Sequence, residues 1–207
     1  SNAFVLNKHS IAKVYGFQLE ATNAASGSGF ALYDNAWAQL GYMTIDGFGT
    51  YGMSIRRQSG VRVQDPMTIR NSGSYGVDVR ESGYLYAPNI VVHDNLYGVV
   101  VTTGSTAILN GSESYNNTYN GYTASYSSYI SASKADAHDN DYYGFSASYD
   151  SSISADQSIS EDNVRSGYYA LDSSIRARTA SAVNNGVYGY RVSFNSFIDA
   201  NYSSNSG

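Results

Sequence analysis

Residues 144–163, with the sequence GFSASYDSSISADQSISEDN, contain one complete copy of the pattern that decides the fold. Small or apolar residues recur at every second position in three parts of this stretch: Phe145 and Ala147, Ile153 and Ala155, and Ser158 and Ser160. A period of two residues is typical of a β-strand with one buried face. The stretch therefore predicts three short strands, with neither a helical segment nor a hairpin signal between them.

The glycine that opens this copy recurs along the chain at intervals of 22 to 24 residues. The eight glycines in this register are Gly29, Gly52, Gly76, Gly98, Gly121, Gly144, Gly167 and Gly189. A large residue follows each of them: Phe30, Met53, Val77, Val99, Tyr122, Phe145, Tyr168 and Tyr190. Repeats of this length are typical of solenoids, in which each repeat buries the apolar surface of its neighbours.

These observations predict an all-β fold, a right-handed parallel β-helix with about eight turns of 22–24 residues and three short strands in each turn. We expect residues 28–207 to form this β-helix, residues 4–27 to form one or two irregular coils, and residues 1–3 to be the remnant of a removed tag. Asparagines close successive turns and are expected to form an amide ladder along one corner: Asn71, Asn95, Asn117, Asn140, Asn163 and Asn185. Later turns combine an aromatic residue with alanine and serine, so we expect their buried hydroxyls to bond to one another or to the backbone.

The composition argues against several classes of function. The net charge of −5 and the pI of about 5.0 leave no basic field for a phosphate backbone, so we expect no nucleic-acid partner. The absence of cysteine excludes disulfides and thiolate metal ligands. No run of about 18 apolar residues is present, so we expect no membrane insertion.

Charged residues concentrate in the early turns. Because Asp34, Arg57 and Glu81 each lie five residues after a register glycine, they should lie one above another. Asp34 and Glu81 would then be about 9.6 Å apart, near the upper separation of the paired carboxylates in inverting glycosidases. Together with Asp78 and Arg57 they are our catalytic candidates. The alternative that we favour is an ion-pair ladder, in which Arg57 is the counter-ion of both acids.

Tyrosine, serine and asparagine dominate the middle of the chain, where residues 94–163 contain nine acidic residues and one lysine. Rigid amphipathic rings beside small hydroxyls and amides suit the apolar faces and hydroxyl rims of sugars. Our candidate glycan-binding residues are Tyr119, Tyr126, Tyr142, Tyr149, Arg56 and Arg80. The alternative that we favour is that many of these tyrosines stack on their counterparts one turn away and stabilise the solenoid.

No metal site or cofactor is expected from the sequence. His93 and His138 occur in a repeated His-Asp-Asn tripeptide, but they should lie two turns apart, too far to share one metal ion. The Asp and Asn positions at this corner lack the glycine-rich spacing of calcium-binding β-roll repeats. We therefore interpret both histidines as parts of an exposed corner.

The recurring pattern Gly-aromatic-x-Ala-x-x-x-Ser-x-Ile-x-Ala, seen in residues 144–155, resembles the right-handed parallel β-helix repeats of bacteriophage tailspikes and tail fibres, within the pectate-lyase-like superfamily. The resemblance covers about residues 28–205. It implies an extended virion appendage, commonly a homotrimer, that recognises and sometimes cleaves cell-surface polysaccharide. No catalytic motif of that family maps onto Asp34, Arg57, Asp78 or Glu81, and the calcium-binding Asp clusters of pectate lyases are not recognisable.

These observations lead to three hypotheses. The first is a structural and host-surface glycan-binding segment of a phage-type tail protein, located on a virion or outside the cell and more a binding protein than an enzyme. The second is a polysaccharide hydrolase or lyase that uses the charged early turns. The third is a bacterial surface adhesin built on the same solenoid.

Overall fold

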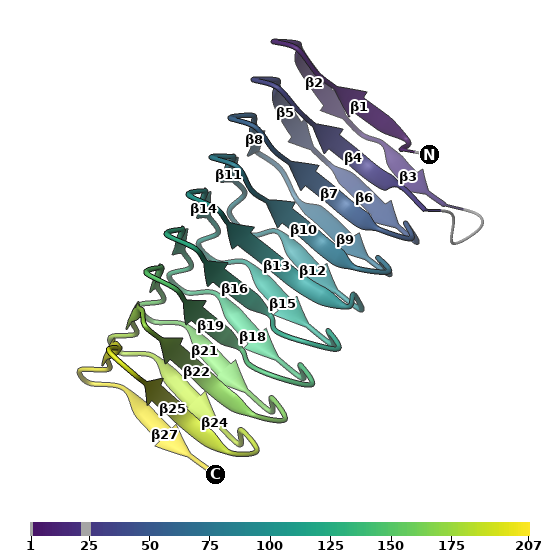
Figure 1. Ribbon diagram of the computed structural model, residues 1–207. Coiled ribbons are helices and arrows are strands. Elements are labelled where there is room, and N and C mark those ends of the chain that lie inside the picture. Colours follow the sequence, from purple (N-terminus) through teal and green to yellow (C-terminus); the bar gives the residue numbers. More distant parts are fainter. Residues whose placement is uncertain (1, 22–25) are drawn as a thin grey trace.

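The structure is a computed structural model that describes residues 2–21 and 26–207 (Figure 1). It is an elongated solenoid with the two termini at opposite ends. The 27 strands of the described residues form three parallel sheets of nine strands each, and every third strand joins the same sheet. We call these sheets A, B and C, in the order in which each turn enters them. The fold class predicted from the sequence, an all-β parallel solenoid with three strands per turn, is confirmed.

Each sheet contains one strand from every turn. Sheet A consists of β1 (Phe4–Leu6), β4 (Ser28–Leu32), β7 (Tyr51–Ile55), β10 (Tyr75–Val79), β13 (Tyr97–Thr102), β16 (Tyr122–Ser125), β19 (Phe145–Ser148), β22 (Ser166–Leu171) and β25 (Tyr188–Ser193). Sheet B consists of β2 (Ile11–Tyr15), β5 (Trp37–Gly41), β8 (Gly60–Val63), β11 (Tyr84–Tyr86), β14 (Thr106–Ile108), β17 (Tyr129–Ser131), β20 (Ser152–Ser154), β23 (Ser174–Arg176) and β26 (Phe197–Asp199). Sheet C consists of β3 (Gln18–Glu20), β6 (Met43–Asp46), β9 (Met67–Arg70), β12 (Val91–His93), β15 (Glu113–Tyr115), β18 (Asp136–His138), β21 (Ile159–Glu161), β24 (Ser181–Val183) and β27 (Ser204–Ser206).

The eight predicted glycines lie at the sheet A strands of eight turns, and the preceding turn, β1 to β3, pairs with its neighbour in all three sheets. The glycines are needed because the chain enters sheet A close to sheet C. A Cβ atom at Gly52 would overlap the side chain of Ile69 and the carbonyl oxygen of Gly76. Within residues 2–21 and 26–207, no helix is long and apolar enough to span a membrane.

The interior changes along the axis as the sequence predicts. Aliphatic side chains fill the early turns, whereas a column of aromatic rings fills the later ones. The rings of Tyr122, Phe145, Tyr168 and Tyr190 stack with centroid distances of 4.9, 5.1 and 4.9 Å. Burial raises the pKa of Tyr122 and Tyr168, so both phenols stay neutral.

Serines that directly precede strands of sheet C satisfy these buried phenols. The hydroxyl of Ser112 lies 2.8 Å from the Tyr122 hydroxyl and donates to the carbonyl oxygen of Leu109 at 2.6 Å. Ser158 repeats this arrangement with Tyr168 at 2.9 Å. These hydroxyls are therefore bonded to one another and to the backbone, as predicted, whereas the buried hydroxyl of Ser166 has no partner among the described residues.

An asparagine ladder fixes the corner between sheets C and A. The buried residues Asn95, Asn117, Asn140 and Asn163 each donate a side-chain N–H to the Oδ1 of the next asparagine, at 2.9 to 3.2 Å. Each also donates its backbone N–H to the same oxygen, at 3.1 or 3.2 Å. Asn185 is the last acceptor. These bonds satisfy polar groups that the corner removes from water.

The prediction that Asn71 belongs to this ladder is wrong. Ser72 occupies the ladder position and donates its backbone N–H to Asn95 Oδ1 at 2.9 Å. Asn71 instead adopts a φ of 55° at the bend itself, where its amide donates to Asp46 at 2.7 Å. Asn71 lies five residues before Gly76, whereas Asn117, Asn140, Asn163 and Asn185 each lie four residues before their glycine, and Asn95 lies three residues before Gly98.

A second ladder, of serines, fixes the corner between sheets A and B. Each serine hydroxyl accepts a backbone N–H from the preceding turn, in most cases from the preceding serine of the column, at 3.1 or 3.2 Å. Its members are Ser59, Ser105, Ser128, Ser151, Ser173 and Ser196. Two of the three corners are therefore held by side chains that repeat with the turn.

We expect Asn140→Ala to lower the free energy of unfolding by about 3 kcal/mol, because it leaves buried groups of Asn117 and Asn163 without partners. Asn71→Gly is the matched control, since glycine accepts the positive φ and the residue is exposed. We expect it to change stability by about 0.5 kcal/mol or less. Urea unfolding followed by circular dichroism measures both, and equal losses would contradict the assignment of the ladder.

Candidate functional site

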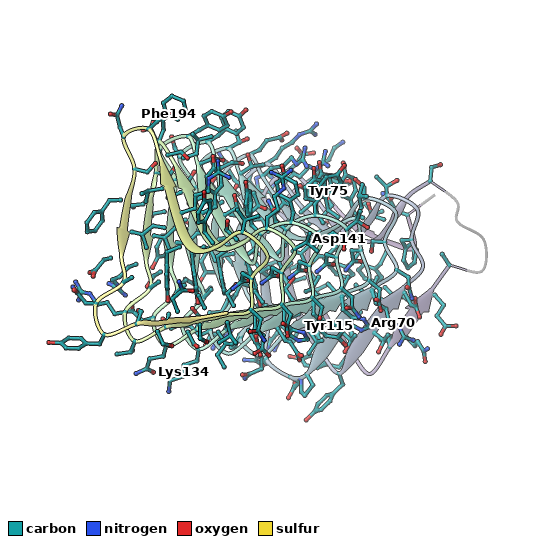
Figure 2. All side chains as sticks on the ribbon, turned by 90° about the horizontal axis from the view of Figure 1, so that it is seen from below. Arg70, Tyr75, Tyr115, Lys134, Asp141 and Phe194 are labelled. Atoms are coloured by element: carbon teal, nitrogen blue, oxygen red, sulfur yellow. The ribbon has the colours of Figure 1, made fainter. Side chains whose placement is uncertain are left out.

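Outward side chains of this solenoid form columns, because parallel register places equivalent residues one strand spacing apart, about 4.8 Å. Figure 2 shows Tyr75 of sheet A on one side of the solenoid, and Tyr115 and Arg70 of sheet C on another. The predicted site residues fall on two of these surfaces. One is the corner between sheets A and B, and the other is the outer face of sheet A.

The corner between sheets A and B brings Asp34, Arg57 and Glu81 together. All three adopt a left-handed backbone conformation, with φ of 58°, 53° and 57°. Arg57 lies 3.2 Å from the Asp34 carboxylate and 3.4 Å from that of Glu81. They line a shallow hollow of about 450 Å³ with Ser82 and Thr103. Arg57 thus stands between the two acids as their shared counter-ion.

The same corner column continues with Tyr126 and Tyr149. Their rings stack with centroids 4.9 Å apart and an interplanar angle of 15°, and both side chains are exposed. Thr103 precedes this pair and Asp172 follows it in the column. The stack therefore has one face at each end that no further ring of the column covers.

Asp78 lies apart from that hollow, on the outer face of sheet A, and its side chain is fully buried. Arg56 donates to one carboxylate oxygen at 2.9 Å, and Arg80 donates to the other. The two guanidinium groups also lie over tyrosine rings, those of Tyr51 and Tyr75. A catalytic role for Asp78 would require Arg56 and Arg80 to move aside.

A ladder of tyrosines runs along the outer face of sheet A. Its members are Tyr51, Tyr75, Tyr97, Tyr119, Tyr142, Tyr143 and Tyr169, with successive ring centroids 4.5 to 6.2 Å apart. Between Tyr51 and Tyr119 the rings are stacked, so their faces cover one another and only their edges reach solvent. Between Tyr119 and Tyr142 the ladder tilts by 57°. Stacking of this kind stabilises neighbouring turns, and it leaves few ring faces for a sugar.

The outer face of sheet B contains a slot that sequence reasoning did not identify. The register Tyr129, Ser152, Ser174, Phe197 places two aromatic residues three turns apart, about 14 Å, with small residues between them. They line a hollow of about 360 Å³. Neither ring has a stacking partner among the described residues, and Phe197 is 64% exposed. Unlike the ladder on sheet A, this slot keeps ring surface available.

Two ion pairs flank the slot. Arg176 contacts Asp156 at 2.9 Å, and Arg178 contacts Asp199 at 2.6 Å. The hydrogen bond between Arg178 and Asp199 raises the pKa of the arginine and lowers the pKa of the carboxyl group, so both stay charged. The slot therefore has charged hydrogen-bonding groups with a balanced net charge.

Trp37 forms a second open aromatic surface on sheet B. Its ring occupies the space that a side chain at Gly60, one turn further, would need. It reaches past Gly60 toward Tyr84, two turns after Trp37, with ring centroids 6.2 Å apart, and it is 46% exposed. The glycine lets the indole lie along the axis of the solenoid against the sheet.

The outer face of sheet C has a stack of three rings, His93, Tyr115 and His138, with centroid distances of 4.7 and 4.8 Å. His138 Nε2 lies 3.0 Å from Glu113, and Nδ1 lies 2.8 Å from Asp139. Burial acts to lower the pKa of His138, but its hydrogen bonds to the carboxylates of Asp139 and Glu113 outweigh burial and raise that pKa. In the described ranges, no group of three or more His, Asp or Glu residues is arranged to hold a metal ion.

Sequence reasoning missed the slot because it followed one column at a time. Tyr129 and Phe197 lie three residues after the corner positions Tyr126 and Phe194, so the signal was present in the register. What the register alone did not reveal is that Ser152 and Ser174 leave a hollow between the two rings.

The chain belongs to the right-handed β-helix family: a family model described as "Right handed beta helix region" matches residues 28–206. The handedness predicted from the sequence agrees with this family. No curated protein sequence matches the chain.

Solved structures with the same fold act on polysaccharides according to their descriptions. A double mutant of the periplasmic alginate epimerase AlgG superposes with a TM-score of 0.75 at 14% identity, over 97% of this chain and 61% of that chain. The mannuronan C-5 epimerase AlgE4 A-module of Azotobacter vinelandii gives 0.59 at 17% identity, over 88% and 65%. Pectate lyase Pel9A gives 0.60 at 11% identity, over 97% and 72%. The chain thus spans less than two thirds of the length of the epimerases, and these likenesses show a shared fold.

We expect Asp78→Asn to lower the free energy of unfolding by about 2 kcal/mol, because it leaves Arg56 and Arg80 without their shared counter-ion. The loss is smaller than for a fully buried pair, since the two arginine side chains keep 22% and 25% of their surface in solvent. The same substitution at Asp34, which is an exposed partner of Arg57, should cost about 0.5 kcal/mol or less. Chemical unfolding of both variants tests this difference, and a larger loss for Asp34→Asn would refute it.

We expect His138→Phe, which keeps a ring against Tyr115, to destabilise the protein at low pH more than at high pH. Because the folded-state pKa of His138 is raised, its charge stabilises the fold fully below the unfolded pKa of about 6.5, and this contribution disappears as pH rises through the folded value. The difference between wild type and variant should reach about 1 kcal/mol or less near pH 6 and vanish near pH 9. Thermal unfolding at both pH values measures it; a difference that does not depend on pH would rule out this role of the charge.

Proposed function

We propose that this chain binds a polysaccharide that lies along the outer face of sheet B. The observation that carries the proposal is the slot between Tyr129 and Phe197, whose rings are not used for stacking between turns. Sugar rings pack their apolar faces on such aromatic surfaces, while their hydroxyls bond to polar groups at the rim. Ser152 and Ser174 on the floor, with Arg176 at the side, supply those groups.

The placement of the other aromatic residues on sheet B supports a ligand parallel to the solenoid axis. Trp37, Tyr84 and Tyr129 occupy the same register column on alternate turns, and Gly60 and Thr106 occupy the turns between them. Their backbone positions are about 9.6 Å apart, while the indole of Trp37 leans over Gly60 and brings its ring centroid to 6.2 Å from that of Tyr84. A glycan lying along the column would meet the Trp37 and Tyr84 rings first, then Tyr129, and then Phe197 across the slot.

The corner beside sheet B forms the rim of this surface. The hollow lined by Asp34, Arg57 and Glu81 lies at one end, and the exposed stack of Tyr126 and Tyr149 follows it along the same edge. We propose that Tyr126 and Tyr149 contact the same glycan. Of the other glycan-binding candidates, Tyr119 and Tyr142 lie at the corner that leads into sheet A, and Arg56 and Arg80 are engaged with Asp78 of that sheet.

The solved structures support polysaccharide as the class of ligand, since their descriptions name alginate epimerases and a pectate lyase. A tailspike or tail-fibre origin, a virion location and a homotrimeric parent protein remain sequence-based proposals, and a surface adhesin is the alternative. Within polysaccharide chemistry we favour binding over catalysis. Arg57 contacts both candidate carboxylates, an arrangement typical of an ion-pair ladder.

We expect Tyr129→Ala and Phe197→Ala each to weaken glycan binding about tenfold, equivalent to about 1.4 kcal/mol, because each removes one wall of the slot. Hexasaccharides of a neutral glucan, of pectate and of alginate are suitable probes, with isothermal titration calorimetry as the measurement. Tyr202→Asn is the matched control: it removes a ring that is 94% exposed outside the slot, and asparagine tolerates the positive φ.

Unchanged affinity in both slot variants would exclude this surface as the binding site. The same mixtures should be analysed for released or modified oligosaccharides. Turnover that is lost in Glu81→Gln or Asp34→Asn would replace the binding proposal with a polysaccharide hydrolase or lyase acting at the corner.

A further inference from the structure

Three of the nine arginines form no ion pair in the part of the chain that the structure describes. Arg62, Arg165 and Arg191 lack a carboxylate partner, whereas the other six are paired with an aspartate or glutamate. Two of the three, Arg165 and Arg191, lie together on the outer face of sheet A. The chain carries a net charge of −5, so two neighbouring unpaired cations are unusual within it.

A group of tyrosine rings joins these two arginines. The Cζ atom of Arg165 lies 4.2 Å from the ring centroid of Tyr142, and that of Arg191 lies 5.2 Å from the ring of Tyr169. Tyr143 lies between them, with its ring centroid 4.6 Å from each of these tyrosine rings. Both guanidinium groups are therefore held in place by aromatic faces.

The backbone places the two arginines on adjacent turns. Arg165 directly precedes β22, and its carbonyl oxygen accepts the Val187 N–H at 2.6 Å. Arg191 in β25 is the register partner of Tyr169 in β22. The site therefore rests on β22, β25 and the short segments that lead into sheet A, rather than on a long loop.

A serine interrupts the tyrosine column at this point. Ser166 occupies the column position of Tyr188, one turn before it, and its buried Oγ has no hydrogen-bond partner among the described residues. Because serine is small, Tyr143 stacks on Tyr169 rather than on a ring in its own column. The break separates the ladder from Tyr188, whose ring is 53% exposed and lies 5.9 Å from Arg191 Cζ.

The charges of Arg165 and Arg191 both act on the phenol of Tyr143. Burial and the neighbouring Tyr142 raise the pKa of Tyr143, while Arg191 and Arg165 both act to lower it. Both positive charges thus act on one phenol. An anion near Tyr143 would be attracted by both of them.

At the other end of sheet A, a similar pair of arginines has a carboxylate as its shared partner. There Arg56 and Arg80 also lie over tyrosine rings, and the carboxylate of Asp78 accepts hydrogen bonds from both, one through each oxygen. Asp78 and Arg191 belong to the same outward column of sheet A. At the Arg165 end, two arginines and tyrosines come together, and no carboxylate of the described residues forms an ion pair with either arginine.

We propose that Arg165 and Arg191 form a binding site for a carboxylate or similar oxyanion carried by an acidic polysaccharide, with Tyr143, Tyr169 and Tyr188 as its aromatic frame. Arginine binds such groups through paired N–H donors. The exposed ring of Tyr188 and the phenol edges of the ladder offer further contacts to the sugars that carry the charge. This site lies on sheet A, so it is separate from the slot on sheet B and does not depend on it.

A glycan suits the site better than a nucleic acid does. A nucleic acid presents closely spaced phosphates, and its affinity depends on many cations, whereas this chain is acidic overall and offers two unpaired ones here. An acidic polysaccharide has one charge on each sugar or on each second sugar. Two arginines on adjacent turns match that lower charge density.

The test uses the full chain and calorimetric titration at low salt with three hexasaccharides: oligogalacturonate, a sulfated glucan and the neutral glucan. We expect one or both acidic probes to bind, whereas any binding of the neutral probe belongs to the slot on sheet B and should be the same in the arginine variants. The double variant Arg165→Gln, Arg191→Gln should lose at least tenfold in affinity for the acidic probe. The double variant Arg165→Lys, Arg191→Lys should lose less, because lysine keeps the charge without the paired donors.

The matched control is Lys8→Gln combined with Lys134→Gln, which removes the same charge at exposed positions outside sheet A and should keep the affinity. Circular dichroism and thermal unfolding establish that every variant is folded. No binding of either acidic probe, or unchanged affinity for the acidic probe in the glutamine variant, would overturn the proposal. Tight binding of a single-stranded oligonucleotide without binding of uronate would assign the site to nucleic acid instead.

Discussion

The hydrogen bonding of each turn to its neighbours in exact register is the constraint on which the rest of this structure depends. No single turn of 22 to 24 residues has a core of its own, so each gains its burial from the turns on either side. The asparagine and serine ladders protect that register at two corners, because a shifted turn would leave their backbone and side-chain groups unpaired. Every outward column then follows from the same alignment.

The alignment also decides which aromatic residues remain available to a ligand. Where tyrosine follows tyrosine in a column, the rings cover one another and mainly stabilise the solenoid. Where glycine or serine interrupts a column, ring surface or a charged group is exposed instead. Gly60 lets Trp37 lie open, Ser152 and Ser174 create the slot, and Ser166 separates Tyr188 from the ladder. Interruptions of the repeat, rather than the repeat itself, therefore create the candidate sites.

Much of the fold could be predicted from the sequence, because the spacing of the glycines and the alternation of apolar and polar residues reflect backbone geometry directly. The same counting placed Asp34, Arg57 and Glu81 in one column, where ion pairs now join them. It failed at Asn71, which lies one residue away from the ladder position. It also did not show that Asp78 is buried, since that depends on where Arg56 and Arg80 direct their long side chains. Sites that form where side chains from several turns pack together could not be predicted by considering one column at a time.

Because the strand spacing is uniform, distances along the solenoid axis are multiples of one strand spacing. Duplication or loss of one whole repeat in the gene would change the distance between two surfaces by a single increment of about 4.8 Å, while every corner kept its bonding. Such a protein can adjust its span to a new glycan in discrete steps during evolution. A length change that is not a whole repeat would instead turn inward-facing residues outward and disrupt the neighbouring turns.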